Sequence, residues 1–104
     1  MDRIEKLRGF LILNPDDNFV KHALALEYIK SGNDDKAEEL FEEILANDEQ
    51  YIGSYYHLGK LLERNNQREK ALKWYEKGMM IAKKLGDNHS FNELAVAYED
   101  LNDL

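Results

Sequence analysis

The feature that most constrains how this chain can fold is a repeat with a period of 34 residues. Leu24 and Ala25 are followed 34 positions later by Leu58 and Gly59. The other pairs at this spacing are Tyr28 with Leu62, Gly32-Asn33 with Asn66-Gln67, Ala37 with Ala71, Phe41 with Tyr75, and Ile44 with Gly78. Sequence units that recur at one fixed period fold into equivalent structures that stack on each other. We therefore predict two equivalent units in tandem.

Within each unit the apolar residues follow the spacing of an α-helix. Ala37, Leu40, Phe41 and Ile44 fall at i, i+3, i+4 and i+7, so they share one helix face. No segment alternates between apolar and polar residues as a half-buried strand does. The pattern predicts no strand and about six helices, at residues 2–13, 18–31, 35–47, 51–65, 68–84 and 89–102.

Polar residues between the apolar stripes indicate where the helices begin. The segment Asn14-Pro15-Asp16-Asp17 is typical of one that ends a helix and caps the next. Three later pairs have the spacing of a capping box: Asp35 with Glu38, Asn66 with Glu69, and Ser90 with Glu93. We expect the first residue of each pair to cap the helix that follows.

Composition excludes several functional classes. The 104 residues are 43% apolar and 34% charged, which favours one globular domain over a disordered segment. The net charge of −7 disfavours nucleic acids and anionic membranes, because both attract basic surfaces. The absence of cysteine excludes disulfides and thiolate chemistry. We find no signal-peptide core and no apolar run of membrane-spanning length, so we expect a cytoplasmic protein.

Charge is distributed unevenly along the chain. Residues 31–50 are strongly acidic, residues 60–84 are basic, and residues 85–104 hold five acidic side chains with no Lys or Arg. This pattern indicates either complementary faces on neighbouring helices or charge-guided assembly with a partner. We favour the first interpretation, because exposed ion pairs each contribute little to stability.

The sequence resembles the tetratricopeptide repeat family. The second unit reads Tyr55-x-x-Leu58-Gly59-x-x-Leu62 and then Ala71-x-x-x-Tyr75, while the first reads Lys21-x-x-Leu24-Ala25-x-x-Tyr28 and then Ala37-x-x-x-Phe41. Leu94-Ala95-x-x-Tyr98 matches the first half of a further repeat, displaced by two residues. The chain departs from the family pattern at Lys21, which replaces an aromatic residue, at Glu49 and Lys83, which replace prolines, and at Gly78, which replaces alanine.

This resemblance implies an all-α fold, a right-handed superhelical stack of antiparallel helix pairs. We expect one domain over residues 1–104, made of an N-terminal half repeat at 2–15, full repeats at 18–51 and 52–85, and a C-terminal half repeat or capping helix at 88–104. Small residues such as Ala25 and Gly59 are expected where two helices approach closely.

The resemblance also implies function. In this family the first helix of each repeat lines a concave groove that binds a peptide segment or helix of another protein. The groove positions carried over to this chain are Phe19, His22, Ala23, Leu26, Lys30, Gly53, Tyr56, His57, Lys60, Arg64, His89, Asn92, Glu93 and Val96. We expect a protein-binding module or scaffold, with neither an enzymatic activity nor a cofactor.

Two groups among these positions have alternative interpretations. Phe19, Ala23 and Leu26 form an apolar strip. It is either buried, against a neighbouring helix or in a subunit contact, or open as a pocket for an apolar anchor of a partner. The three histidines, His22, His57 and His89, could in principle hold a metal, but their spacing matches no metal motif. We interpret them as polar groups of the groove that titrate near neutrality, and we predict no metal site.

Some family members clamp the carboxylate at a partner's C-terminus with Lys and Asn side chains. Here His22, Leu26, His57, His89 and Glu93 occupy those positions, so we do not expect capture of an acidic C-terminal tail. No nucleophile–base constellation supports an enzyme. The alternative to a binding module is a self-associating protein that uses its end helices and its oppositely charged faces, and we expect a monomer or a weak homo-oligomer.

Overall fold

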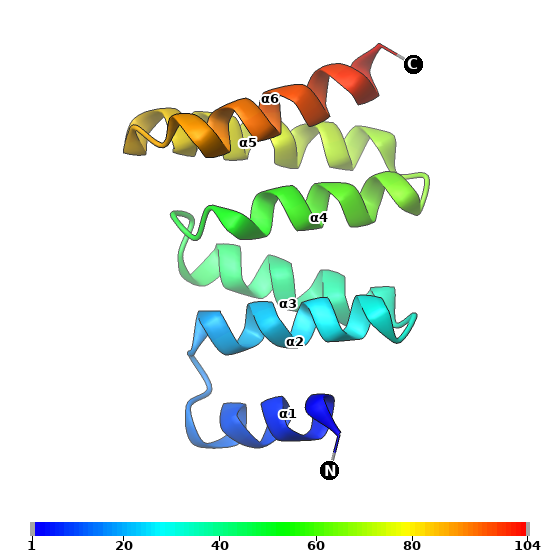
Figure 1. Cartoon of the computed structure of the whole chain (residues 1–104), viewed down its shortest axis with the longest axis vertical. Coiled ribbons are helices and arrows are strands. Elements are labelled where there is room, and N and C mark those ends of the chain that lie inside the picture. The colour runs from blue at the N-terminus through cyan, green and yellow to red at the C-terminus, as the bar shows by residue number, and fades with distance from the viewer. Residues whose placement is uncertain (1, 104) are drawn as a thin grey trace. The chain divides into compact units, whose positions relative to one another are not determined.

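A computed structural model describes residues 2–103 of the chain. Within that range it is all-helical, with six helices and no strand (Figure 1). The helices are α1 (Arg3–Leu13), α2 (Asn18–Lys30), α3 (Asp34–Asn47), α4 (Gly53–Arg64), α5 (Arg68–Leu85) and α6 (Asn88–Asn102). Every predicted helix is present, and each predicted end lies within two residues of the observed one. The all-α fold class is therefore confirmed.

The chain divides into two compact units, Met1–Asp48 with α1 to α3 and Glu49–Leu104 with α4 to α6. In the first unit, which we call unit 1, α2 packs against both α1 and α3. The buried apolar side chains of α2 and α3 are those of the repeat pattern, Leu24, Ala25, Tyr28, Ala37, Phe41 and Ile44, together with Leu45. α1 adds one buried residue, Leu7, to this core.

Lys21 is a charged member of this core. Lys21 is only 3% exposed, and its Nζ lies 3.1 Å from Oε1 of Glu43 on α3. Glu43 is largely exposed, so the ion pair joins a buried cation to a carboxylate at the surface. The long aliphatic stem of a lysine can fill an apolar site while its charged end reaches a partner, which explains how Lys21 occupies an aromatic position of the repeat.

In the second unit, which we call unit 2, α5 packs against α4 and α6, and α4 also contacts α6. Two glycines make this packing tight. A Cβ atom at Gly59 would overlap the ring of Tyr75, and one at Gly78 would lie 2.7 Å from Cβ of Tyr55 and 2.9 Å from Cδ1 of Leu94. Neither contact is possible for a real Cβ atom, so α4, α5 and α6 reach their observed spacing only because these positions lack side chains.

Three helix ends have the same backbone geometry. Gly32, Asn66 and Gly86 have φ angles of 81°, 62° and 71°, and each follows a helix. The residue after each donates a hydrogen bond to a carbonyl five positions earlier, as in Asn33 N–H to Tyr28 O at 2.8 Å and Gln67 N–H to Leu62 O at 2.9 Å. This bond pattern is the Schellman motif, which requires a left-handed residue and favours glycine or asparagine.

The residues that cap the helix N-termini are not the ones predicted from capping-box spacing. The caps of α1, α2 and α6 are Asp2, Asp17 and Asp87, whose carboxylates accept bonds from backbone N–H groups three residues later. Asp17 confirms the predicted cap before α2. The predictions of Asp35, Asn66 and Ser90 as caps were wrong. The cap positions of α3 and α5 are Asn33 and Gln67, and neither side chain makes a capping hydrogen bond. α6 is capped by Asp87.

Candidate functional site

A cavity of about 400 Å³ lies between α4 and α6 in unit 2. α4 contributes Tyr56 and Lys60, which are one helical turn apart. α6 contributes a row of residues at helical spacing: His89, Asn92, Glu93, Val96, Ala97 and Asp100. We call this cavity the α4–α6 groove.

Packing on the far side of α6 sets the geometry of this groove. Leu94 and Leu101 are buried, and Leu94 fits against Gly78 of α5. The guanidinium of Arg68 on α5 donates to the carbonyl oxygens of Leu101 and Asn102 at 3.2 and 3.1 Å. A cation bonded to the last carbonyls of a helix is stabilised by the helix dipole. These contacts hold α6 along α5 and leave its other face toward Tyr56.

The positive charge of Lys60, which lines the groove, is partly balanced by the carboxylate of Glu63. The Tyr75 hydroxyl donates to Oε2 of Glu63 at 2.8 Å, and Nζ of Lys60 lies 3.7 Å from the same oxygen. Burial, followed by the bond to Glu63, raises the pKa of Tyr75, so its hydroxyl stays protonated as a donor. The Lys60 ammonium also lies 5.7 Å from the centre of the Tyr56 ring, within the range of a cation–π contact.

His57 lies beside the groove without lining it. Its ring meets Tyr56 edge-on, with the ring centres 5.7 Å apart. Burial lowers the pKa of His57, and the negative charge of Glu93 opposes that shift in part. The imidazole is therefore neutral at pH 7.

The structure brings together some of the predicted groove residues and not others. Tyr56, Lys60, His89 and Asn92 line the α4–α6 groove, together with Glu93 and Val96. Arg64 is exposed but is not part of the lining. Ala97 and Asp100 also line the groove and were not among the predicted positions. Asp100 lies one turn beyond Val96, so extending the helical spacing of the predicted positions by one turn would have found it.

The predicted positions of unit 1 lie on α2. Phe19 is 74% exposed, so the alternative of burial against a neighbouring helix is wrong for this residue. His22 packs edge-on against the ring of Phe41, with centres 5.5 Å apart, and Leu26 is half-buried.

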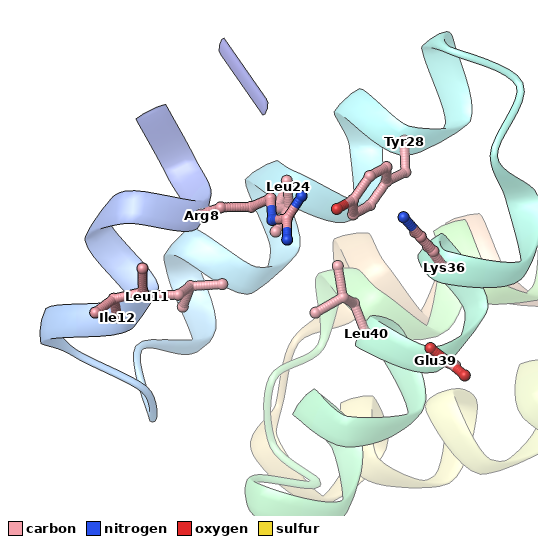
Figure 2. A pocket seen from close by; sticks show the side chains of 8 residues that line it. All are labelled: Arg8, Leu11, Ile12, Leu24, Tyr28, Lys36, Glu39 and Leu40. Atoms are coloured by element: carbon pink, nitrogen blue, oxygen red, sulfur yellow. The ribbon is translucent and has the colours of Figure 1, made fainter. Parts of the chain in front are cut away.

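A second cavity, of about 390 Å³, lies in unit 1 and contains none of the predicted groove residues. Figure 2 shows its lining from three helices: Arg8, Leu11 and Ile12 of α1, Leu24 and Tyr28 of α2, and Lys36, Glu39 and Leu40 of α3. The Lys36 ammonium lies 5.4 Å from the centre of the Tyr28 ring. No sequence pattern indicates this cavity, because Leu24 and Tyr28 are core positions of the repeat.

The family of this chain is identified by its match to a known sequence profile. The sequence profile described as tetratricopeptide repeat matches residues 20–51 and 52–88, which is more than half of the chain. The chain belongs to the tetratricopeptide repeat family. Proteins of this family generally act as non-enzymatic scaffolds that bind other proteins. No curated protein matches the chain.

Several solved structures resemble this chain. The crystal structure of a tetratricopeptide repeat domain protein from Salinibacter ruber is 39% identical, with 85% of this chain and 98% of that chain covered and a TM-score of 0.80. A protein from Bordetella parapertussis is 25% identical, with 99% and 90% covered and a TM-score of 0.84. The MamA protein is also 25% identical, with 96% of this chain and 55% of that chain covered and a TM-score of 0.75.

The tetratricopeptide signature residues are buried in both full repeats. The ten buried signature residues of the two full repeats are Leu24, Ala25, Tyr28, Ala37, Phe41, Leu58, Gly59, Leu62, Ala71 and Tyr75. In α6, Leu94 is buried but Ala95 and Tyr98 are half-exposed, and the Tyr98 hydroxyl donates to Glu76 at 2.9 Å. The signature therefore marks core positions where a second helix covers the first.

Two further classes of site are not found within residues 2–103. His, Asp and Glu side chains in this range do not gather in threes at a place that could hold a metal ion. None of the helices in the same range combines the length and the apolar character needed to span a bilayer.

Proposed function

We propose that this tetratricopeptide repeat protein binds a segment of another protein in the α4–α6 groove. The observation that carries the proposal is that six of the predicted groove positions, on two different helices, line one cavity of about 400 Å³. Tyr56 and Val96 offer it apolar surface, while Asn92 and His89 offer hydrogen-bonding groups. A cavity of this kind accepts one or two side chains of a peptide.

The size of the groove sets the expected strength of binding. A surface this small buries less area than a standard protein–protein interface, so we expect a Kd on the order of micromolar for a single segment. Tyrosine is enriched among the residues that dominate binding energy, because its ring gives a large contact area and its hydroxyl a polar end. Tyr56 is therefore the residue on which binding should depend most.

A peptide-display selection tests the proposal for a partner segment of any sequence. Peptides selected on the full chain are measured against Tyr56→Ala and Lys60→Ala. Lys73→Ala serves as the matched control for Lys60, since Lys73 is a lysine of α5 outside the groove. We expect Tyr56→Ala to weaken binding at least tenfold and Lys73→Ala to leave it unchanged. Selected peptides that bind Tyr56→Ala as well as the original chain would refute the proposal.

A second candidate function, self-association, is favoured by exposed apolar side chains on α1. Phe10, Ile12 and Leu13 are 57%, 82% and 79% exposed. α1 also carries Arg3, Lys6 and Arg8, whereas residues 85–104 carry acidic groups and no Lys or Arg. These features suit contact between α1 of one copy and α6 of another.

Light scattering coupled to size exclusion, at low and high salt, tests this second function. We expect a concentration-dependent dimer or larger species that Phe10→Ser or Leu13→Ser reduces. A monomer whose mass does not change with salt or concentration would exclude it.

A further inference from the structure

We infer that the segment bound in the α4–α6 groove is basic, with two Lys or Arg side chains on either side of one apolar residue. This inference rests on the proposed function and specifies the chemistry of the partner. Three features of the groove support it: the carboxylates without an ion-pair partner, their spacing along α6, and the apolar surface between them.

The α6 wall of the groove carries negative charge that nothing in the described part of the chain neutralises by an ion pair. Glu93 and Asp100 both line the cavity, both are exposed, and neither takes part in a salt bridge within residues 2–103. The sequence from residue 85 to residue 104 contains no Lys or Arg that could pair with them on their own helix. A cationic ligand would supply the missing partners.

The positive charge on the opposite wall is already engaged. Lys60 is held by Glu63 at 3.7 Å and faces the Tyr56 ring, so its ammonium is shared between two groups of α4. His57 is neutral at pH 7 because burial lowers its pKa, so it does not repel a cation. The groove therefore presents a net negative field, and an acidic segment would meet Glu93 and Asp100 with like charge.

The spacing of the two carboxylates fixes the pattern of the ligand. Glu93 and Asp100 are seven residues apart on α6, which is about 10.5 Å along a helix axis. Val96 lies between them and is 59% exposed, with Tyr56 on the facing helix. Basic residues seven apart on a helix lie on one face and match this distance. An apolar side chain midway between them, at i+3 or i+4, lies on the same helix face and reaches Val96 and Tyr56.

Three peptides of one length test the inference. The first has two lysines seven residues apart with a leucine midway, the second has glutamines in place of the lysines, and the third has glutamates. Fluorescence anisotropy measures each against the full chain at low and at physiological salt. We expect the lysine peptide to bind at least tenfold more tightly than the glutamate peptide, with a difference that shrinks as salt rises.

Substitutions on α6 locate the effect. Glu93→Gln and Asp100→Asn should each weaken the lysine peptide about two- to fivefold, which is the range for an exposed ion pair. Glu99→Gln is the matched control, since Glu99 is an exposed carboxylate of the same helix outside the groove. Glu93→Lys combined with Asp100→Lys should reverse the preference and favour the glutamate peptide. Circular dichroism checks that each variant keeps its helices.

The outcomes separate this inference from the proposed function. Equal affinity for the three peptides, or no loss of binding in Glu93→Gln and Asp100→Asn, overturns the inference. If displayed peptides then still depend on Tyr56 but show no enrichment of Lys or Arg, the groove binds a partner of other chemistry and only the inference fails. If no displayed peptide depends on Tyr56, the proposed function fails as well.

Discussion

The two full repeats build the same core from different side chains. At one pair of equivalent positions, repeat one places Ala25 and Phe41, and repeat two places Gly59 and Tyr75. All four residues are buried. In repeat two, the Tyr75 ring occupies the space where a Cβ of Gly59 would lie. Tyr75 also has a fixed hydroxyl, bound to Glu63. The same fold therefore accepts a different division of volume between facing helices, provided that each pair fits together.

A second pair of positions differs in chemistry. Lys21 in repeat one forms an ion pair with Glu43, whereas Tyr55 in repeat two is fully buried and donates its hydroxyl to the carbonyl of Glu49 at 2.6 Å. Gly78 provides the room for Tyr55, while its counterpart in repeat one is Ile44. The comparison shows that the repeat period determines which positions are buried, but each repeat satisfies its polar groups in its own way.

The largest expected effect comes from giving repeat two the alanine of repeat one. Gly59→Ala places a methyl group in the space of the Tyr75 ring, and the hydroxyl bond to Glu63 limits how far that ring can move. Overpacking of this kind costs about 1–3 kcal/mol, and the better helix propensity of alanine offsets only about 1 kcal/mol. Because the added Cβ would overlap the Tyr75 ring itself, we expect a cost at the upper end of this range. The net loss in the free energy of unfolding should then be about 2 kcal/mol, measured by urea denaturation followed by circular dichroism.

Two variants make this first prediction specific. Gly9→Ala is the matched control, because a Cβ at Gly9 of α1 meets no atom within 4 Å, and it should stabilise the chain by up to about 1 kcal/mol. Gly59→Ala combined with Tyr75→Phe recreates the pair of repeat one and frees the ring from Glu63. This double variant should recover part of the loss. A neutral Gly59→Ala would show that the helices of repeat two separate easily.

The next effect tests whether the ion pair of repeat one stabilises the fold. Lys21→Met keeps the apolar stem and removes the charge, and replacing a buried charge by an apolar group of similar volume is often neutral or stabilising. We expect a change between 0 and about 1 kcal/mol in favour of the folded state. Glu43→Gln leaves the buried ammonium without a counter-ion and should destabilise by about 1 kcal/mol. If Lys21→Met destabilised more than Glu43→Gln, the ion pair would be the main source of stability at this site.

Much of the fold could be predicted from the sequence because the repeat signal is long. Eight pairs of positions at one spacing fix the helices and the core, and errors at single positions do not shift the register. Helix starts were harder, since a cap depends on which of several adjacent polar residues comes first. Asn66 has capping-box spacing, yet it takes the left-handed position that ends α4 instead of starting α5.

The candidate site was less predictable, for two physical reasons. The groove positions came from the family resemblance, and only six of them, all on α4 or α6, line the α4–α6 groove. The cavity in unit 1 depends on the distance between side chains of different helices, such as Leu11 of α1 and Leu40 of α3. The spacing of residues in the sequence does not specify this distance. The burial of Lys21 was also unforeseen, because a charged residue in a repeat is normally exposed.

A smaller effect compares the turns of the two repeats. Gly32 and Asn66 are equivalent, and both have positive φ, at 81° and 62°. Asparagine tolerates the left-handed region better than other residues with a Cβ atom, but glycine enters it without a steric penalty. Asn66→Gly should therefore stabilise the chain by about 0.5 kcal/mol, and Gly32→Asn should destabilise it by a similar amount. Thermal melts of both variants check the prediction, and a destabilising Asn66→Gly would contradict it.

The smallest effect concerns His57, whose equivalent in repeat one is Ala23. Burial lowers the pKa of His57 below its usual value of 6.5, so below that pH the unfolded chain binds a proton more readily than the folded chain does. Stability that is complete above pH 6.5 should therefore fall as the pH drops through the lowered pKa. His57→Ala, which copies repeat one, removes this dependence while leaving all other titrating groups in place. We would measure the melting temperatures of both chains between about pH 8 and pH 5. The melting temperature of the original chain should fall relative to that of the variant only below about pH 6.5. A difference that stays constant over this range would mean that His57 is as easily protonated in the folded chain as in the unfolded one.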